Sequence, residues 1–283
     1  MDFGEILDGS LMIYRRHFGL FLRLAVVTLS APTVLLVYLG ARFVGSLVTQ
    51  TPSLQAMLPI IPLIPVAILY YLASLVLTAG TIRIISDAYL GRTPHLREAL
   101  SLGLSKIWPL VGVGLGKGMI LGLIVFGIVV LTAILAAMAK SVGAVAVLLL
   151  IGVIVGGGWF LVFVLCGYGL TTPVVVLEPL ASSFDAFGRS WELTRSFRLK
   201  VLGLGMVAIL LTNTLPSIVF RALGTVLLPS VPALGVTLTV VSYVVPLILA
   251  PILAAVITLM YYDLRVRREA FDLQVLGQQL GII

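Results

Sequence analysis

The chain alternates between long apolar stretches and short polar connections. Six stretches are each longer than a membrane-spanning helix requires, and they cover residues 18–45, 58–85, 108–139, 142–177, 201–228 and 234–262. A transmembrane helix needs about 20 predominantly apolar residues to cross the hydrocarbon core. The pattern therefore predicts an all-α, polytopic membrane protein with about six transmembrane helices, in a single integral membrane domain over residues 1–283.

Composition supports this interpretation and excludes a soluble protein. Hydrophobic residues make up 60% of the 283 residues, charged residues make up 10%, and the mean hydropathy is +1.21. One core of a 30.2 kDa protein cannot bury this much apolar surface. The net charge of +7 is carried largely between the apolar stretches, so it predicts contact with membrane lipids and no nucleic-acid binding. The single Cys166 excludes a disulfide within the chain.

The charges also predict the orientation of the chain in the membrane. Six spans place both termini on one side. Fourteen of the 18 Lys and Arg residues lie in or beside the termini and the connections between spans two and three and between spans four and five. Because Lys and Arg gather in cytoplasmic connections, both termini are predicted to be cytoplasmic, with all 11 acidic residues on the same face.

A threefold repeat divides the chain into units of about 1–91, 92–180 and 181–283. Each unit contains an eight-residue segment directly before an odd-numbered span, and the three segments are SLMIYRRH, SLGLSKIW and SWELTRSF. All three begin with Ser and carry a basic residue at the sixth position. These matched positions form the interfacial repeat: Ser10 and Arg15, Ser101 and Lys106, Ser190 and Arg195.

Each repeat segment belongs to a predicted amphipathic helix at the membrane interface. In the first copy, apolar residues such as Phe3, Leu7 and Leu11 recur every four residues and form one face. The basic residues are expected to meet lipid phosphates. The even-numbered spans end in an acidic residue, and these span-terminal acids are Asp87, Glu178 and Asp263. We therefore predict a unit of interfacial helix, transmembrane hairpin and terminal acid, repeated about an axis along the membrane normal.

Two further segments carry a resemblance to a known family. PVVVLEPLASSFDAFGRSWELTR at 173–195 and PILAAVITLMYYDLRVRREAFDL at 251–273, with the opening FGEILDGSLMIYRRHFGLFL, resemble a bacterial integral membrane family. It is named for the membrane domain attached to some glycerophosphoryl diester phosphodiesterases, and many members stand alone. The resemblance implies a multi-span protein of the bacterial inner (cytoplasmic) membrane without an established activity. In the fused enzymes, a separate soluble barrel of roughly 250 residues carries the chemistry, and no soluble stretch here is long enough to form one.

Residue types that support catalysis are sparse. The only two histidines, His17 and His95, lie at separate membrane-edge positions and do not form a pair of metal ligands on one helix. No acidic residue falls at mid-membrane, which argues against an intramembrane aspartyl protease or a carboxylate proton relay. The sequence therefore predicts a protein that is not an enzyme and holds no cofactor and no metal.

One glycine-rich segment superficially resembles a phosphate-binding loop. GVGLGKG at 112–118 lacks the Ser or Thr that would follow Lys117, and it lies within an apolar stretch. Glycines at intervals of four residues instead favour close packing between transmembrane helices. In spans three and four these are Gly114, Gly118, Gly122, Gly152 and Gly156.

Three polar residues within the spans have two interpretations. Lys117 and Arg221 place charge in hydrocarbon, at a cost of roughly 2.5–3.5 kcal/mol on insertion scales. Their side chains either extend to the nearest headgroups or, with Asn213, line an intramembrane polar pathway. The span-terminal acids likewise either pair with neighbouring arginines at the span ends or form a ring at a cytoplasmic opening.

Two functional hypotheses follow from these features. The first is a non-enzymatic inner-membrane scaffold or accessory subunit of a larger membrane assembly, which also organises lipid. Its expected partners are membrane lipids and a membrane protein, or further copies of the chain. The alternative is a transporter or channel for a small solute, ion or lipid, with Lys117, Asn213 and Arg221 along the pathway.

The predicted orientation is testable with reporter fusions. Green fluorescent protein joined to either terminus should fluoresce, because it folds in the cytoplasm, and alkaline phosphatase inserted near residue 141 should be active outside the cytoplasm. Active alkaline phosphatase at a terminus would contradict the orientation.

Overall fold

The computed structural model describes residues 1–49 and 60–269. Within these ranges the chain consists of helices and connecting loops, without a strand. Six helical segments are long and apolar enough to cross a membrane, which confirms the predicted all-α, polytopic fold. The first two residues of the predicted second span, 58 and 59, lie outside the described ranges.

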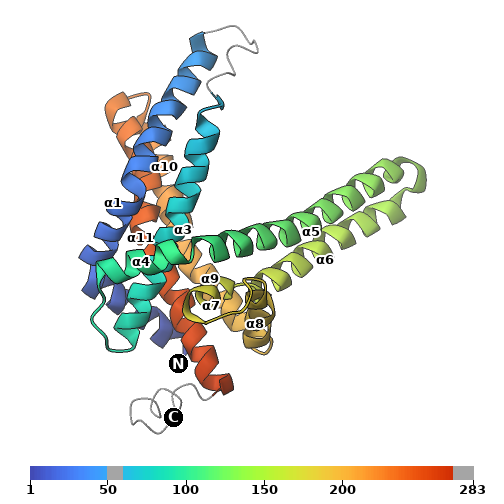
Figure 1. The fold of residues 1–283 in the computed structure, drawn as a ribbon. Helices are drawn as coiled ribbons and strands as arrows, with labels where there is room; N and C mark the ends of the chain where they lie inside the picture. Colours follow the sequence, from blue (N-terminus) through green and yellow to red (C-terminus); the bar gives the residue numbers. More distant parts are fainter. Residues whose placement is uncertain (50–59, 270–283) are drawn as a thin grey trace.

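The long helices form three antiparallel hairpins. The first consists of α1 (Phe3–Thr49) and α3 (Leu63–Tyr89), and the second of α5 (Ile107–Val142) and α6 (Ala144–Gly167). In the third, α9 (Arg198–Ile209), the π-helical turn η2 (Leu210–Thr214) and α10 (Leu215–Leu227) run against α11 (Pro232–Glu269). The first and third hairpins pack side by side through α1 and α11, whereas α5 and α6 diverge from them (Figure 1).

Three short helices lie where the hairpins meet. They are α4 (Leu96–Ser105), α7 (Thr171–Leu177) and α8 (Asp185–Thr194). The N-terminus lies at this same end of the molecule (Figure 1). Because each long hairpin returns the chain to this end, the connections between hairpins supply the packing that holds the three together.

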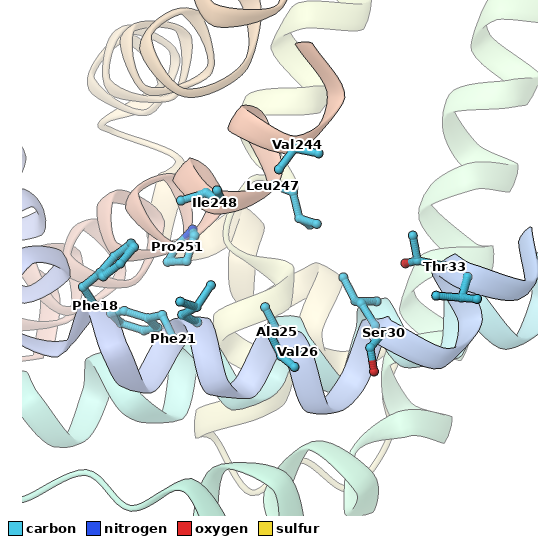
Figure 2. A pocket seen from close by; sticks show the side chains of 13 residues that line it. Phe18, Phe21, Ala25, Val26, Ser30, Thr33, Val244, Leu247, Ile248 and Pro251 are labelled. Carbon is cyan, nitrogen blue, oxygen red and sulfur yellow. The ribbon is translucent and has the colours of Figure 1, made fainter. Parts of the chain in front are cut away.

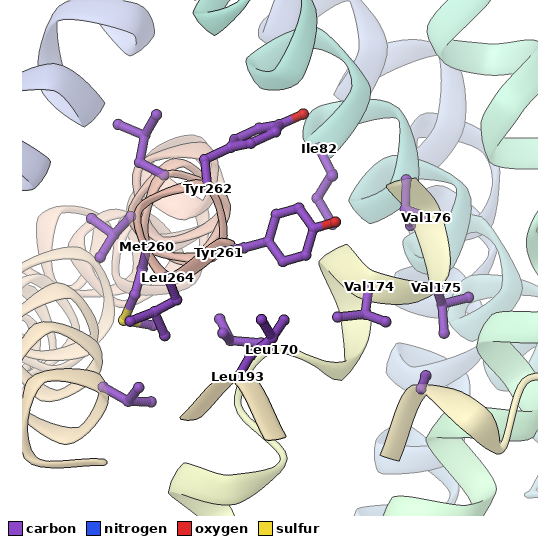
Figure 3. Packing of buried hydrophobic residues seen from close by; sticks show 14 of the residues in the cluster. Ile82, Leu170, Val174, Val175, Val176, Leu193, Met260, Tyr261, Tyr262 and Leu264 are labelled. Carbon is purple, nitrogen blue, oxygen red and sulfur yellow. The ribbon is translucent and has the colours of Figure 1, made fainter. Parts of the chain in front are cut away.

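The largest apolar core lies at this end around α11. Tyr261 is fully buried, and it lies among Leu170 and Val174 of the α6–α7 region, Leu193 of α8 and Ile82 of α3 (Figure 3). Away from this core, the first and third hairpins remain in contact through α1 and α11. The second hairpin is joined to the other two at this end.

Small residues allow the first hairpin and α4 to approach closely. A methyl group on Gly103 of α4 would lie 2.7 Å from the Val76 carbonyl oxygen of α3, and one on Gly80 would lie 2.9 Å from the Leu24 side chain of α1. Such distances leave no space for a side chain. Transmembrane helices associate through close van der Waals packing of this kind.

The backbone departs from helical geometry between each short or N-terminal helix and its following span. His17 (φ −115°, ψ 19°), Lys106 (φ −97°, ψ 6°) and Phe197 (φ −127°, ψ 22°) adopt similar conformations. His17 and Phe197 occupy the last position of their repeat segments, and Lys106 lies two positions earlier. The first copy is one helix, α1, with a kink. The arrangement of the units about a threefold axis stays a prediction, since the second hairpin diverges.

The glycines of the second hairpin differ from the packing expected of them. A methyl group on Gly118, Gly122, Gly152 or Gly156 would meet nothing within 4 Å, so no described helix of this chain packs closely on these four glycines. Gly114 does lie against the Tyr71 hydroxyl of α3. The two helices of the hairpin instead contact each other where Gly157 faces Ile128. Glycine spacing identifies a smooth face but not the helix that covers it.

The close contact at Gly103 generates a stability prediction. Gly103→Ala should lower the unfolding temperature in detergent, because the added methyl group forces α4 away from α3 at a cost of about 1–3 kcal/mol. Gly188→Ala on α8 is the matched control, since a methyl group there meets nothing within 4 Å. Equal unfolding temperatures for the two variants would contradict the packing.

Candidate functional site

The span-terminal acids lie at the end where the hairpins meet, and each is ion-paired. Asp263 of α11 accepts from the Met1 amino group (2.6 Å), Lys200 Nζ (2.7 Å) and Arg267 Nε (3.1 Å). Its side chain is only 2% exposed. Lys200 Nζ and Arg267 also donate to the Met1 carbonyl oxygen, at 2.7 and 3.1 Å. Asp263 therefore joins α9, α11 and the start of the chain before α1.

Glu178, at the end of α7, forms the second network. It accepts from Arg189 Nε of α8 at 3.0 Å and from the Tyr261 hydroxyl at 2.8 Å, and Arg265 Nε lies 3.8 Å away. Arg189 and Arg265 both also pair with Glu269. Burial lowers the pKa of Arg189, but its hydrogen bonds and ion pairs with both glutamates outweigh burial and raise that pKa above its ordinary value. This network ties α7 and α8 to α11.

Asp87, at the end of α3, forms the third network. Its Oδ2 accepts from Arg83 Nε at 2.8 Å, and Arg83 Nη2 reaches Glu98 of α4 at 3.5 Å. The other carboxylate oxygen, Oδ1, is buried without a hydrogen-bond partner. Next to it in sequence, the Ser86 hydroxyl lies 2.6 Å from the Tyr262 hydroxyl of α11. A polar pocket of about 460 Å³ is lined by Asp87 and Glu178, but Asp263 is not among its lining residues.

The interfacial-repeat residues have three different environments. Ser10 and Ser190 are fully buried, and Ser190 Oγ donates to the Gly167 carbonyl oxygen (2.8 Å) while accepting from the Leu170 amide (3.2 Å). Ser101 is exposed. Among the basic positions, Arg15 and Arg195 are exposed, whereas Lys106 Nζ donates to the Val175 carbonyl oxygen at 2.9 Å. Lys106 therefore donates a hydrogen bond to a carbonyl oxygen in the last turn of α7. The carbonyl groups of a helix's last turn have no amide donor within the helix.

The three intramembrane polar residues do not line one common cleft among the described residues. Arg221 of α10 stacks over the Tyr243 ring of α11, with its guanidinium carbon 5.1 Å from the ring centroid. Asn213 is exposed in η2, three residues before Pro216. Lys117 lines a cleft to which Thr214 contributes, while neither Asn213 nor Arg221 is among the lining residues.

Two openings lie within the predicted membrane region. The cleft at Lys117 has a volume of about 470 Å³ and lies between α5, α6, α9 and α11. A second groove of about 320 Å³ lies between α1 and α11, and apolar side chains such as Phe21, Leu29 and Ile248 dominate its lining (Figure 2). Ser30 and Thr33 are its only polar lining side chains. Both openings present surfaces suited to acyl chains.

A metal-binding arrangement is not formed by the described part of the chain. No group of three or more His, Cys, Asp or Glu side chains lies close enough to hold a metal within residues 1–49 and 60–269. The described carboxylates of the three networks are engaged with cations or hydroxyl donors. Chemically, the arrangement is suited to clamping helices together and to contacting lipid.

Three groups at this end were not expected from the sequence. Lys200 and the adjacent tyrosines, Tyr261 and Tyr262, contribute to the networks. Arg198 is held between two rings, 3.6 Å from the Phe163 centroid and 4.1 Å from the Trp191 centroid. The paired tyrosines directly before Asp263 were a usable signal, because a Tyr hydroxyl at a buried helix end normally requires a hydrogen-bond partner.

Comparisons with known proteins found no match among protein families, curated proteins or solved structures. The resemblance described above thus rests on the residues that carry it.

The Asp263 network generates a second stability prediction. Asp263→Asn should lower the unfolding temperature markedly, because it leaves the Met1 amine, Lys200 and Arg267 without their shared carboxylate. Breaking a buried ion pair typically costs about 3–5 kcal/mol. Glu192→Gln, at an exposed position of α8, should have little effect. Unfolding temperatures within about one degree of each other would contradict the clamp.

Proposed function

We propose that the protein is a non-enzymatic membrane scaffold, an accessory subunit whose α5–α6 hairpin docks against a partner membrane protein. The supporting observation is the divergence of this hairpin from the other two (Figure 1). The most apolar 18-residue window of α5 has no buried residue. Helices in a bilayer gain stability chiefly from packing on other helices. Away from the end where the three hairpins meet, which is the base of this hairpin, α5 and α6 pack mainly on each other.

The open glycines support a protein partner over lipid alone. Gly118, Gly122, Gly152 and Gly156 leave smooth strips on α5 and α6 that the chain itself does not cover. Such strips let another helix backbone approach closely, whereas flexible acyl chains gain nothing specific from them. We infer that a partner helix lies along this hairpin.

The base of the hairpin is built to hold it at a fixed angle. Gly116 lies against Phe187 of α8, with a methyl group there 3.1 Å from the Phe187 ring, and Gly114 lies against Tyr71 of α3. Arg189 and Glu178 fasten α8 to the end of α7. A rigidly rooted, laterally exposed hairpin suits a scaffold, because it presents a binding face without moving the rest of the protein.

Transport is the less favoured function. A pathway needs polar groups that follow one another across the membrane, and Lys117, Asn213 and Arg221 lie in separate environments. We also propose that the protein lies in the bacterial inner membrane with both termini in the cytoplasm. The family resemblance and the uneven distribution of charge along the chain support this location. The end where the hairpins meet carries the three ion-pair networks of Asp87, Glu178 and Asp263, and we call it the charged end. In this orientation the charged end lies at the cytoplasmic face.

Site-specific photocrosslinking in cells tests the scaffold proposal. p-Benzoylphenylalanine at Phe126 of α5 or Trp159 of α6 should crosslink to one and the same membrane protein. The matched control is Val37 of α1, since all three side chains are equally exposed, at 66%, 66% and 65%. Val37 should give no such adduct, because the proposal assigns docking to the second hairpin.

Two results would overturn this proposal. Adducts with lipid alone at all three positions would remove the partner. An adduct of two copies of the chain would replace the accessory subunit with a self-assembling protein.

A further inference from the structure

The Lys117 cleft lies between the second hairpin and the third. Gly116, directly before Lys117, lies against Phe187 of α8, and Ile120 further along α5 packs against the core. α6 forms one wall of the cleft, and α9 and α11 form the other. Its volume of about 470 Å³ is within the range of small-molecule and cofactor sites.

The walls of the cleft are apolar. Leu165 and Cys166 of α6 face it from one side, and Met206, Ile209 and Ile257 are among the side chains on the other. This lining suits an acyl chain.

Among the described residues that line this cleft, Lys117 alone is charged. It has no ion pair, hydrogen bond or ring contact among the described residues. The described carboxylates are gathered at the charged end and are held by other cations where they are buried. A lysine within a span without a protein counter-ion is costly. An anion from outside the described chain would offset this cost.

We propose that this cleft binds an acidic lipid, whose anionic headgroup pairs with the Lys117 ammonium and whose acyl chain lies along the apolar walls. The depth is suitable, because Lys117 lies ten residues, about 15 Å, along α5 from Ile107. The helix is far longer than the hydrocarbon core needs, so a lysine side chain extending toward the charged end reaches the level of the headgroups. The positive charge of Lys117 favours a ligand with an acidic group. The apolar lining favours a lipid with an acyl chain over a free ion.

Arg221 provides a contrast within the same protein. It is also a cation within a candidate span, but its guanidinium lies over the Tyr243 ring and it does not line the Lys117 cleft. Arg221→Met is thus a matched control that removes an intramembrane charge without altering the cleft. The lipid site does not depend on the scaffold proposal, since it requires no partner protein.

The experiment uses the full-length purified protein in phosphatidylcholine nanodiscs that contain a trace of a photoreactive lipid. Three probes carry the same diazirine-labelled acyl chain: phosphatidylglycerol, phosphatidylcholine and the free fatty acid. Mass spectrometry then locates and quantifies labelled peptides. Phosphatidylglycerol should label the cleft walls at 201–210 and 253–260 preferentially over phosphatidylcholine. Lys117→Met should reduce this labelling about tenfold, the effect of losing one charge-assisted contact.

The variants separate charge from folding. Lys117→Arg should retain labelling, and labelling of Arg221→Met should match the wild type. Loss of labelling in Lys117→Met would not result from failed insertion, because removing the lysine charge favours insertion into the membrane. Strong labelling by the free fatty acid instead of phosphatidylglycerol would support the site and identify a carboxylate as its acid. Equal labelling by phosphatidylglycerol and phosphatidylcholine, or unchanged labelling in Lys117→Met, would overturn the proposal. No partner protein is present in the nanodisc, so neither result bears on the crosslinking experiment.

Discussion

The buried ion pairs at the charged end are the interaction on which the rest of the structure depends. Between helices in lipid there is little hydrophobic driving force, because acyl chains are as apolar as the side chains. Asp263 of α11 instead binds Lys200 of α9, and Glu178 binds Arg189 of α8 while accepting a hydrogen bond from the Tyr261 hydroxyl of α11. Since the hairpins are tied at this end, their far ends are free to pack together or to diverge.

The sequence predicts the helices well because length and apolarity are local properties. Six long apolar stretches became six candidate spans, and the short amphipathic segments around Ser101 and Ser190 became α4 and α8. The span-terminal acids were also recognisable from position alone. Their partners were only partly predictable: Arg83 lies one helical turn from Asp87, whereas Lys200 reaches Asp263 from the opposite arm of the third hairpin, 63 residues away in the sequence.

The glycines of the second hairpin show why packing was not predictable. A spacing of four residues specifies a strip on one helix, but contact requires a second surface brought to it by the whole fold. Gly114 and Gly116 meet Tyr71 of α3 and Phe187 of α8, whereas Gly118 faces away from Gly116, about 200° around the helix, where no described side chain lies near it. Lys117 was likewise identifiable as unusual from its sequence position, but the cleft beside it arises from the divergence of two hairpins.

Lys117 stands on α5 at the cleft that the second hairpin forms with α9 and α11. An opening between helices in a bilayer does not stay empty, because lipid fills the space that the helices leave. A lysine in the lining makes that filling selective, since an acidic headgroup gains an ion pair in a medium of low dielectric. The lipid then supplies to the root of the second hairpin the contact that protein side chains supply elsewhere.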